Sequence, residues 1–271
     1  MLERVVVTFS GEGSSVKIED STAVMEPSAA GSSVKIEDST AVMEPSAASD
    51  DSDSPRPKTE HSRSTLQLFL SVDIAGVGIG GDMWPAATLF SNVATSVSYR
   101  GFISSLFDGR RVLELGSGTG LCGILVDKAF SPTSVVITDQ ESHMPLIIGN
   151  MRRNSTSGAC TAQTLDWTDA QTFPSAGSFD IILAMECVYH EKLYQPLIEA
   201  IAHCAHDDCL VFLGVTRQFA KPQFYAKLAA ARFSYTLLPH EALPPSCSAD
   251  TGGRDCGLFL LQRRRQRATG Q

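Results

Sequence analysis

The chain has 271 residues, 43% of them hydrophobic, which is enough to form the core of one large domain. Its formal net charge is −8, and its seven cysteines are scattered, without a Cys-x-x-Cys pair. This cysteine usage fits a reducing compartment better than a disulfide framework. No apolar run reaches the ~18 residues that a membrane span requires, and MLERVVVTFSGEG lacks the regions of a secretory signal.

The charge is unevenly distributed. Residues 1–64 hold 12 acidic against 6 basic side chains, whereas residues 65–271 hold 18 against 16. A nearly neutral C-terminal part argues against strong binding to a phosphate backbone. The basic cluster RRRQR at 263–267 is interpreted as a solvated tail, with a nuclear-import or acidic-partner patch as the alternative.

The block GSSVKIEDSTAVMEPSAA occurs twice without a difference, at 13–30 and 31–48. Solenoid repeats share a core and need three or more units, so two polar copies predict no solenoid. The following SDDSDSPRPKTEHSRS is equally poor in groups that can be buried. Residues 1–64 are therefore predicted to be a disordered acidic tail without chemistry.

From residue 66 the pattern changes. Residues 66–74 alternate apolar and polar side chains as a strand does, and AGVGIGG follows as a turn. Trp84 and Pro85 open a helix, because proline suits the first helical turn. Further strands are expected at 111–116, 134–139, 160–167, 179–185, 209–216, 233–239 and 256–264, and further helices at 120–130, 144–154, 190–205 and 221–233.

Near-continuous apolar strands that alternate with amphipathic helices indicate a mostly parallel sheet with helices on both faces. The sequence thus predicts one Rossmann-like α/β domain at 65–271. Ligands of such sheets bind beyond the carboxyl ends of the strands.

VLELGSGTG at 112–120 follows a strand with Gly116, Gly118 and Gly120 and then opens a helix. Glycines let the backbone approach a ligand closely, and the helix N-terminus presents free N–H groups. Dinucleotide-binding proteins share this geometry, but their fingerprint is Gly-x-Gly-x-x-Gly. The spacing here is GSGTG.

Two carboxylates separate these alternatives further. Glu114 precedes the glycines, where it would repel a pyrophosphate and complement a cationic methionine moiety. Asp139 ends the next strand, where it can accept both ribose hydroxyls of an adenosine. Together they favour a methyltransferase that uses S-adenosylmethionine over a dinucleotide enzyme.

LDW at 165–167 follows the third strand of the domain. Asp166 can accept a hydrogen bond from the adenine amino group, and Trp167 offers a flat surface beside the ring. The alternative is that Trp167 is a core residue.

WPAATLF, VLELGSGTGLCGI, VVITD, LDW and FDIILAMECVYHEKLYQPLIEAI together resemble the non-SET protein-lysine methyltransferases of the methyltransferase-like 21 type. The resemblance covers roughly residues 66–262. It implies a seven-stranded, mostly parallel sheet whose last strand is antiparallel. It also implies that Trp84 lies close to the cofactor, S-adenosylmethionine, and Met185 is counted with the cofactor-binding residues.

In that family an Asp-x-x-Tyr follows the fourth strand, where this chain has Glu186 and Tyr189 in ECVY. Glutamate keeps the charge but adds one methylene, which puts the acceptor in question more than the reaction. Methyltransferases that act on nucleobases or glutamine resemble Asn/Asp-Pro-Pro-Tyr at this position. ECVY contains no proline.

Glu186 and Tyr189 are the expected catalytic residues. Methyl transfer from a sulfonium is an in-line displacement, so catalysis depends mainly on alignment. A carboxylate favours the charged form of a nearby ammonium. Glu186 is therefore expected to orient the amine, while an apolar channel and the sulfonium lower the amine's pKa. Tyr189 is expected to line the channel and to contact the amine.

Three further groups have a structural interpretation beside a functional one. The histidines and cysteines of HCAHDDC fit no tetrahedral zinc set, so no metal is expected at His203, Cys204, His206 and Cys209. Cys187 is interpreted as buried filler rather than a reactive thiol. Asn150 and Asn154 are interpreted as structural.

The expected activity is methylation of a lysine side chain on a protein of the cytoplasm, with the nucleus as a second location. The expected partner is a protein substrate, such as a chaperone or a translation factor. Neither nucleic acid nor membrane is expected, and the chain is expected to be a monomer. Two alternatives stay open: another acceptor (a histidine, an α-amine or a small molecule), or an interaction module that binds the cofactor without activity.

Overall fold

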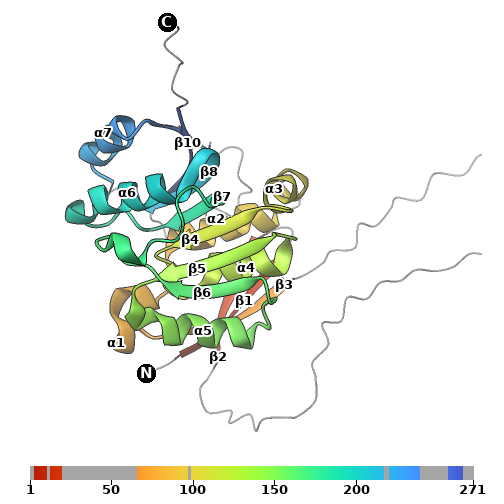
Figure 1. Ribbon diagram of the computed structural model, residues 1–271. Coiled ribbons are helices and arrows are strands. Elements are labelled where there is room, and N and C mark those ends of the chain that lie inside the picture. The colour runs from red at the N-terminus through yellow and green to blue at the C-terminus, as the bar shows by residue number, and fades with distance from the viewer. Residues whose placement is uncertain are drawn as a thin grey trace, which may run out of the picture.

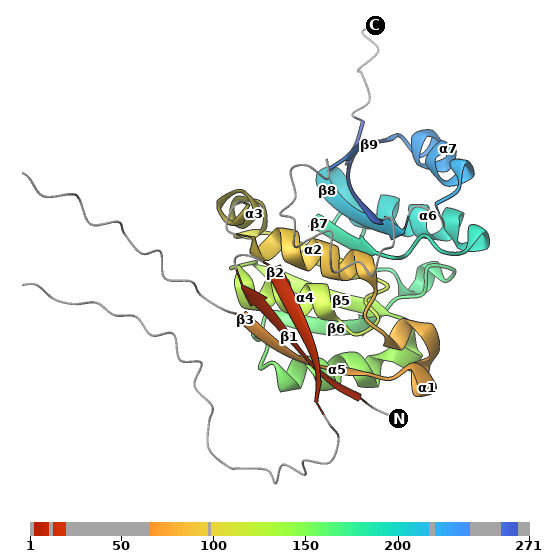
Figure 2. The same cartoon turned by 180° about the vertical axis from the view of Figure 1, so that it is seen from behind.

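Seven apolar segments pair into one sheet in the computed structural model, in the strand order β6-β5-β4-β7-β8-β10-β9 (Figure 1). A second sheet of three strands, in the order β2-β1-β3, packs on the helices that cover one face of the large sheet (Figure 2). The structure describes residues 3–10, 13–19, 66–96, 99–216, 220–238 and 256–264.

The middle of the large sheet is parallel and nearly free of exposed side chains. Its parallel strands are β4 (Arg111–Leu115), β5 (Ser134–Asp139), β6 (Cys160–Thr164), β7 (Phe179–Met185) and β8 (Ala205–Thr216). β10 (Cys256–Arg263) runs antiparallel between β8 and β9 (Phe233–Leu237). This confirms the predicted seven-stranded sheet with an antiparallel last strand.

Helices cover both faces of this sheet and form two cores. One core includes side chains of α2 (Pro85–Thr95), α4 (Leu121–Ala129) and α5 (Met144–Arg153). The other includes side chains of α6 (Tyr194–Cys204) and α7 (Pro222–Ala230). The sequence had not indicated α3 (Arg100–Phe107), in which Ile103 and Phe107 are buried. Its serines and glycine weaken the helical pattern.

The glycine-rich segment before α2 is helical rather than a simple turn. It consists of α1 (Ile74–Val77) and the 3₁₀ helix η1 (Gly78–Gly81). Asp73 caps α1, because its carboxylate accepts a hydrogen bond from Gly76 N (2.9 Å). Three more 3₁₀ turns follow, namely η2 (Glu141–His143), η3 (Ala170–Thr172) and η4 (Glu191–Leu193).

The prediction of a disordered tail is wrong for residues 3–10 and 13–19. β1 (Glu3–Ser10) pairs antiparallel with both β2 (Gly13–Glu19) and β3 (Leu66–Val72). Val5 and Val7 are buried, because the alternation in ERVVVTFS puts both on the face that packs on the core. The rest of the predicted tail, including the second repeat copy, lies outside the described residues.

Two asparagines of α5 join the small sheet to the large domain. Asn154 accepts from Phe69 N (2.8 Å) and donates to Phe69 O (2.7 Å). Asn150 does the same with Ser71 N (2.7 Å) and Ser71 O (3.0 Å). These amides, one helical turn apart, satisfy the outer edge of β3 as a neighbouring strand would. Both asparagines are therefore structural in this respect, as interpreted from the sequence.

Among the described residues, the structure contains no helix that is long and apolar enough to cross a membrane.

Candidate active site

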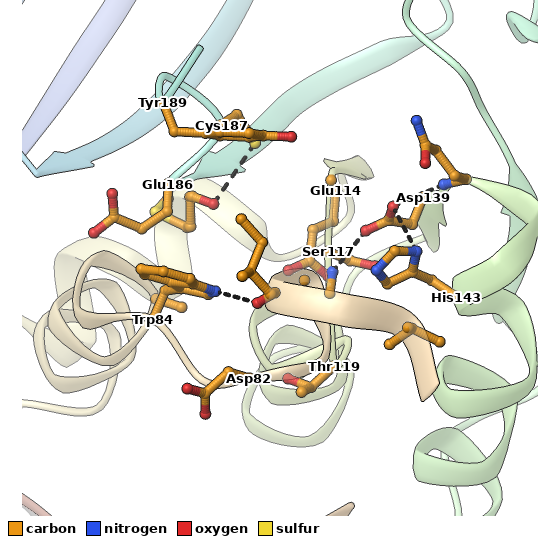
Figure 3. A pocket seen from close by; sticks show the side chains of 18 of the residues that line it. Asp82, Trp84, Glu114, Ser117, Thr119, Asp139, His143, Glu186, Cys187 and Tyr189 are labelled. Atoms are coloured by element: carbon orange, nitrogen blue, oxygen red, sulfur yellow. Dashed lines mark hydrogen bonds and ion pairs between the residues drawn. The ribbon is translucent and has the colours of Figure 1, made fainter. Parts of the chain in front are cut away.

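A cavity of ≈ 520 Å³ lies at the carboxyl ends of β4, β5 and β7 (Figure 3). Parallel sheets place their ligands at this edge, and pockets of this size hold small molecules and cofactors. Trp84, Glu186 and Tyr189 lie along one side of the cavity, and Asp139 and His143 lie on the opposite side. All site residues predicted from the sequence line the cavity, with the exception of Gly120.

The glycine-rich loop allows two close approaches. Gly116 and Gly118 have positive φ angles of 59° and 58°, which favour glycine. A Cβ atom on Gly116 would lie 2.8 Å from Trp167 Cζ2 and 3.0 Å from Cys187 Sγ, and one on Gly118 would collide with Gly80 O. Gly120, at φ 80°, is the N-cap of α4 and faces isoleucines rather than the cavity.

Glu114 is directed at α4 rather than at a ligand. Only 2% of the residue is exposed, and its Oε2 accepts a hydrogen bond from Gly123 N (2.9 Å) in the first turn of α4. Burial raises the pKa of this carboxyl to about 8 despite that bond, with a further contribution from the nearby Asp139. From the sequence, a charged Glu114 was expected to complement the cationic methionine moiety of the cofactor. In the structure, the Glu114 carboxyl is largely protonated at neutral pH.

Asp139, at the end of β5, is held by its backbone surroundings. Its Oδ2 accepts from Gly118 N (2.8 Å), and its Oδ1 accepts from Gln140 N (2.7 Å). These bonds fix the carboxylate at the rim of the glycine-rich loop. Each oxygen keeps a second lone pair, so the position suits hydrogen bonding to ribose hydroxyls.

His143 is a lining residue that the sequence analysis did not identify. Its Nδ1 lies 3.4 Å from Asp139 Oδ1, and its ring packs closely on Gly80. Its Nε2 and the Ser117 hydroxyl are buried without a hydrogen-bond partner. His143 follows Asp139 by four residues, and this spacing was the feature of the sequence that could have indicated their contact.

The predicted adenine residues follow β6 and face the same cavity. Asp166 Oδ1 accepts from Thr168 N (2.8 Å) and from the Thr168 hydroxyl (2.7 Å), which closes a turn. Trp167 lies against Gly116 and packs partly on the second core. Trp167 therefore agrees with both interpretations made from the sequence, as a cavity residue and as a core residue, because it lines the cavity and also contacts the core.

Two aromatic residues border the side of the cavity that carries Glu186. Trp84 Nε1 donates to Ile79 O (2.8 Å), which holds the indole against η1. Tyr189 is 47% exposed. Partial burial, together with the negative charge of neighbouring groups, raises the pKa of its phenol. The phenol therefore stays un-ionised at neutral pH.

Glu186 lines the cavity, but its carboxylate bonds to the protein. Its Oε1 accepts from Ala86 N (3.2 Å) and from the Thr216 hydroxyl (2.6 Å), and its Oε2 accepts from Thr216 N (2.9 Å). The carboxylate is thus anchored to the start of α2 and the end of β8, and the amine-orienting role expected from the sequence stays a prediction. Thr216 was not identified from the sequence, because it lies 30 residues further along the chain.

The residues on either side of Glu186, Met185 and Cys187, are buried. Cys187 Sγ donates to Leu115 O (3.1 Å), and burial raises the pKa of this thiol well above its usual value. Such a thiol is unreactive, as the interpretation of Cys187 as filler predicted. Met185 lines the cavity at the end of the strand.

The histidines of HCAHDDC have separate partners. His203 Nε2 lies 2.9 Å from Pro174 O, and His206 Nε2 lies 3.0 Å from Asp180 Oδ1. The part of the chain that the structure describes contains no group of three or more potential ligands that could hold a metal ion.

The residues present fit S-adenosylmethionine. Backbone at Gly116 and Gly118 is bare of side chains, and two buried polar atoms, Ser117 Oγ and His143 Nε2, lack partners. Besides the buried Glu114, four carboxyl groups line the cavity, at Asp82, Asp139, Asp166 and Glu186, and no lysine or arginine is found among the described lining residues. Such a lining complements a ligand with a net positive charge.

Residues 63–230 match a family described as lysine methyltransferase. Protein N-lysine methyltransferase METTL21A of Danio rerio is 28% identical over 178 residues, which are 65% of this chain and 78% of the relative. EEF1A lysine methyltransferase 3 of Mus musculus is 27% identical over 181 residues, with 65% and 72% covered. Among solved structures, a putative methyltransferase in complex with SAH aligns with a TM-score of 0.48 and 14% identity, over 72% of this chain and 53% of that one.

The matched segment is more than half of the chain and contains every residue that lines the cavity. The sheet order and the glycine-rich cavity agree with this match. The chain therefore belongs to the lysine methyltransferase family, as an enzyme that uses S-adenosylmethionine.

Proposed function

We propose that the acceptor lysine is part of a protein and reaches the cavity between Trp84 and Tyr189. The supporting observation is the acidic lining, without lysine or arginine among the described lining residues. Four carboxyl groups line the cavity in addition to the buried Glu114. A cleft lined by one sign of charge concentrates ligands of the opposite sign. An ammonium side chain is thus favoured over a neutral or anionic acceptor.

Alignment is the main task of the residues at the acceptor side. When bound, S-adenosylmethionine supplies a methyl group on a sulfonium. Trp84 and Tyr189 confine the lysine stem between aromatic surfaces, and the Tyr189 phenol oxygen accepts a hydrogen bond from the amine. Holding the amine in line contributes several kcal/mol to catalysis.

The amine must lose its proton before it can attack. Glu186 is held by hydrogen bonds from Ala86 and Thr216, and a carboxylate favours the charged form of a nearby ammonium, so we assign the role of proton acceptor elsewhere. We propose that the proton passes to water at the exposed Tyr189 side. Desolvation deeper in the cavity then keeps the amine neutral.

At the cofactor side, Asp139 would bind the ribose hydroxyls, and Asp166 and Trp167 would contact the adenine. Ser117 Oγ and His143 Nε2 would gain partners, because a buried polar atom without a partner costs about 1–3 kcal/mol. Met185 would contact the cofactor near the acceptor side.

We also propose a class of protein substrate and a cellular location for this chain. A translation factor is the favoured class of substrate, since one relative is named for EEF1A, and a chaperone is the alternative. The six cysteines among the described residues are free thiols, which supports a reducing compartment such as the cytoplasm or nucleus.

The test has two steps. Calorimetry measures the binding of S-adenosylhomocysteine, and transfer of labelled methyl groups into a cell lysate then identifies protein bands for mass spectrometry. We expect binding and a methylated lysine. Label on a histidine or an α-amine would show that the acceptor is that group and not a lysine. Binding of S-adenosylhomocysteine without any methyl transfer would support an interaction module.

A further inference from the structure

One carboxylate joins four elements at the acceptor side of the cavity. Glu186 follows the end of β7 and accepts hydrogen bonds from Ala86 N in the first turn of α2 and from Thr216 at the end of β8. Cys256 at the start of β10 completes the group, with its Sγ 3.5 Å from the Thr216 hydroxyl and 3.9 Å from Glu186 Oε1.

The backbone of Glu186 is held in an unusual conformation. Its φ of 57° lies in the left-handed region, which costs a non-glycine residue free energy. Glu186 N donates to Gly214 O (2.8 Å) on β8. The backbone bond and the side-chain bonds therefore connect Glu186 to the same strand, and they offset the strain.

The same carboxylate caps α2. The side chain of Trp84, the N-cap residue, does not cap the helix, and Pro85 has no N–H. Glu186 accepts from Ala86 N instead, and a negative charge at a helix N-terminus is favourable. The cap fixes the position of Trp84 relative to Tyr189, which lies three residues after Glu186.

Side-chain length matters in this arrangement. A glutamate spans from the end of β7 to both Ala86 and Thr216, whereas an aspartate on the same backbone is one methylene shorter. Only 2% of Thr216 is exposed, so the bond from its hydroxyl to Glu186 has little competition from water.

We propose that Glu186 and Thr216 form a positioning pair that sets the separation of Trp84 and Tyr189, and that Glu186 does not contact the acceptor amine. This inference rests on the proposed function, because it assumes that the acceptor passes between these aromatic residues. Glu186 and Thr216 act on the reaction through the entrance that they shape.

Three variants of the full chain test the pair. Thr216→Val removes the hydroxyl at nearly constant volume, Thr216→Ser retains it, and Glu186→Asp keeps the charge but shortens the reach. Thr95→Val is the matched control, because that hydroxyl bonds to Ser91 O at the other end of α2. Calorimetry measures S-adenosylhomocysteine affinity, and labelled-methyl transfer into a fixed lysate measures the initial rate.

We expect Thr216→Val and Glu186→Asp to lower the initial rate at least fivefold while affinity for S-adenosylhomocysteine changes less than threefold. Thr216→Ser and Thr95→Val should resemble the unmodified chain. Loss of rate without loss of affinity distinguishes positioning from general unfolding. A full rate in Thr216→Val or in Glu186→Asp would overturn the proposal.

Hydrogen exchange gives a readout that needs no substrate. In Glu186→Asp, the amides of Ala86 and Thr216 should exchange faster than in the unmodified chain, and unchanged exchange would also overturn the pair. If the unmodified chain labels no lysine in the lysate, the proposed function fails by itself. The exchange measurement still decides whether the pair holds α2 and β8 together.

Discussion

At the residue scale, Glu114 and Asp139 are carboxyl groups at neighbouring strand ends with different surroundings. Glu114 is buried beneath the glycine-rich loop and bonds to α4, whereas Asp139 is partly exposed and bonds to the loop itself. Burial disfavours the charged form of a carboxyl. At neutral pH the Glu114 carboxyl is thus mainly protonated and has a structural role, whereas Asp139 is better placed to bind a ligand.

The raised pKa of Glu114 predicts a pH dependence of stability. The pKa is about 8 in the folded chain against a reference of 4.5. Between these values the folded state retains a proton that the unfolded state has released, so the free energy of unfolding falls as pH rises. Relative to Glu114→Gln, the chain should lose up to about 1.4 kcal/mol per pH unit. Urea unfolding across this window checks it, and parallel slopes would contradict it.

Replacing Gly116 is predicted to weaken cofactor binding. In Gly116→Ala the new methyl group meets Trp167 and Cys187, and the positive φ is unfavourable for alanine. We expect affinity for S-adenosylhomocysteine to fall at least tenfold in calorimetry. Gly149→Ala is the control, since that glycine lies within α5 in open space. It should bind normally and gain about 0.5–1 kcal/mol in stability.

Residue types were predictable from the sequence where the chain itself sets the geometry. Gly116 and Gly118 had to be glycine for a tight loop, and Asp139 had to end a strand. The partners of Glu186 were not predictable, because Ala86 and Thr216 lie 100 and 30 residues away. Only the packing of α2 against β8 brings them to the same carboxylate.

At the element scale, α5 serves as a neighbour for β3. Asn150 also donates to Thr119 O (2.9 Å), so one side chain joins the small sheet, α5 and the glycine-rich loop. The small sheet was missed in part because residues 20–65 separate β3 from the β1–β2 pair. Nothing in ERVVVTFS alone indicates that it pairs with residues 66–72.

Replacing Asn150 tests this junction. Asn150→Leu leaves the N–H and C=O of Ser71 and the C=O of Thr119 without these partners in a buried place. We expect a loss of about 3 kcal/mol or more in the free energy of unfolding, measured with urea. Arg152→Gln, on the exposed side of the same helix, should change stability by less than about 0.5 kcal/mol. Equal effects would show that the amide of Asn150 is dispensable.

At the scale of the whole molecule, the alternation of apolar strands and helices was sufficient to predict the large sheet. Strands that are buried on both faces appear as apolar runs, and FDIILAM and CLVFLGVT are two of them. The three-stranded sheet follows no such local rule. β1 and β2 pair locally, with Ser10 opposite Gly13, but β3 lies far from both in the sequence and completes the sheet only through a non-local pairing.

The repeat makes a prediction about the whole chain. β2 begins the first copy of the block, so deletion of residues 31–48 leaves β1 and β2 intact and only shortens the connection to β3. Loop closure depends weakly on length, and the change is about 0.4 kcal/mol. Thermal unfolding should therefore be nearly unchanged. Deletion of residues 13–48 removes the β2 sequence and should lower the unfolding temperature; stability equal to the full chain would contradict the pairing of β1 with β2.

The identity of the two copies also has a hereditary consequence. Excision of residues 13–30 and excision of residues 31–48 yield the same polypeptide, because the blocks do not differ. In both products GSSVKIE follows Glu12 and meets β1 in the register seen here. A replication error that adds or removes one repeat unit therefore leaves the pairing of β1 with β2 unchanged. The number of units can then vary between generations without selection acting on the fold.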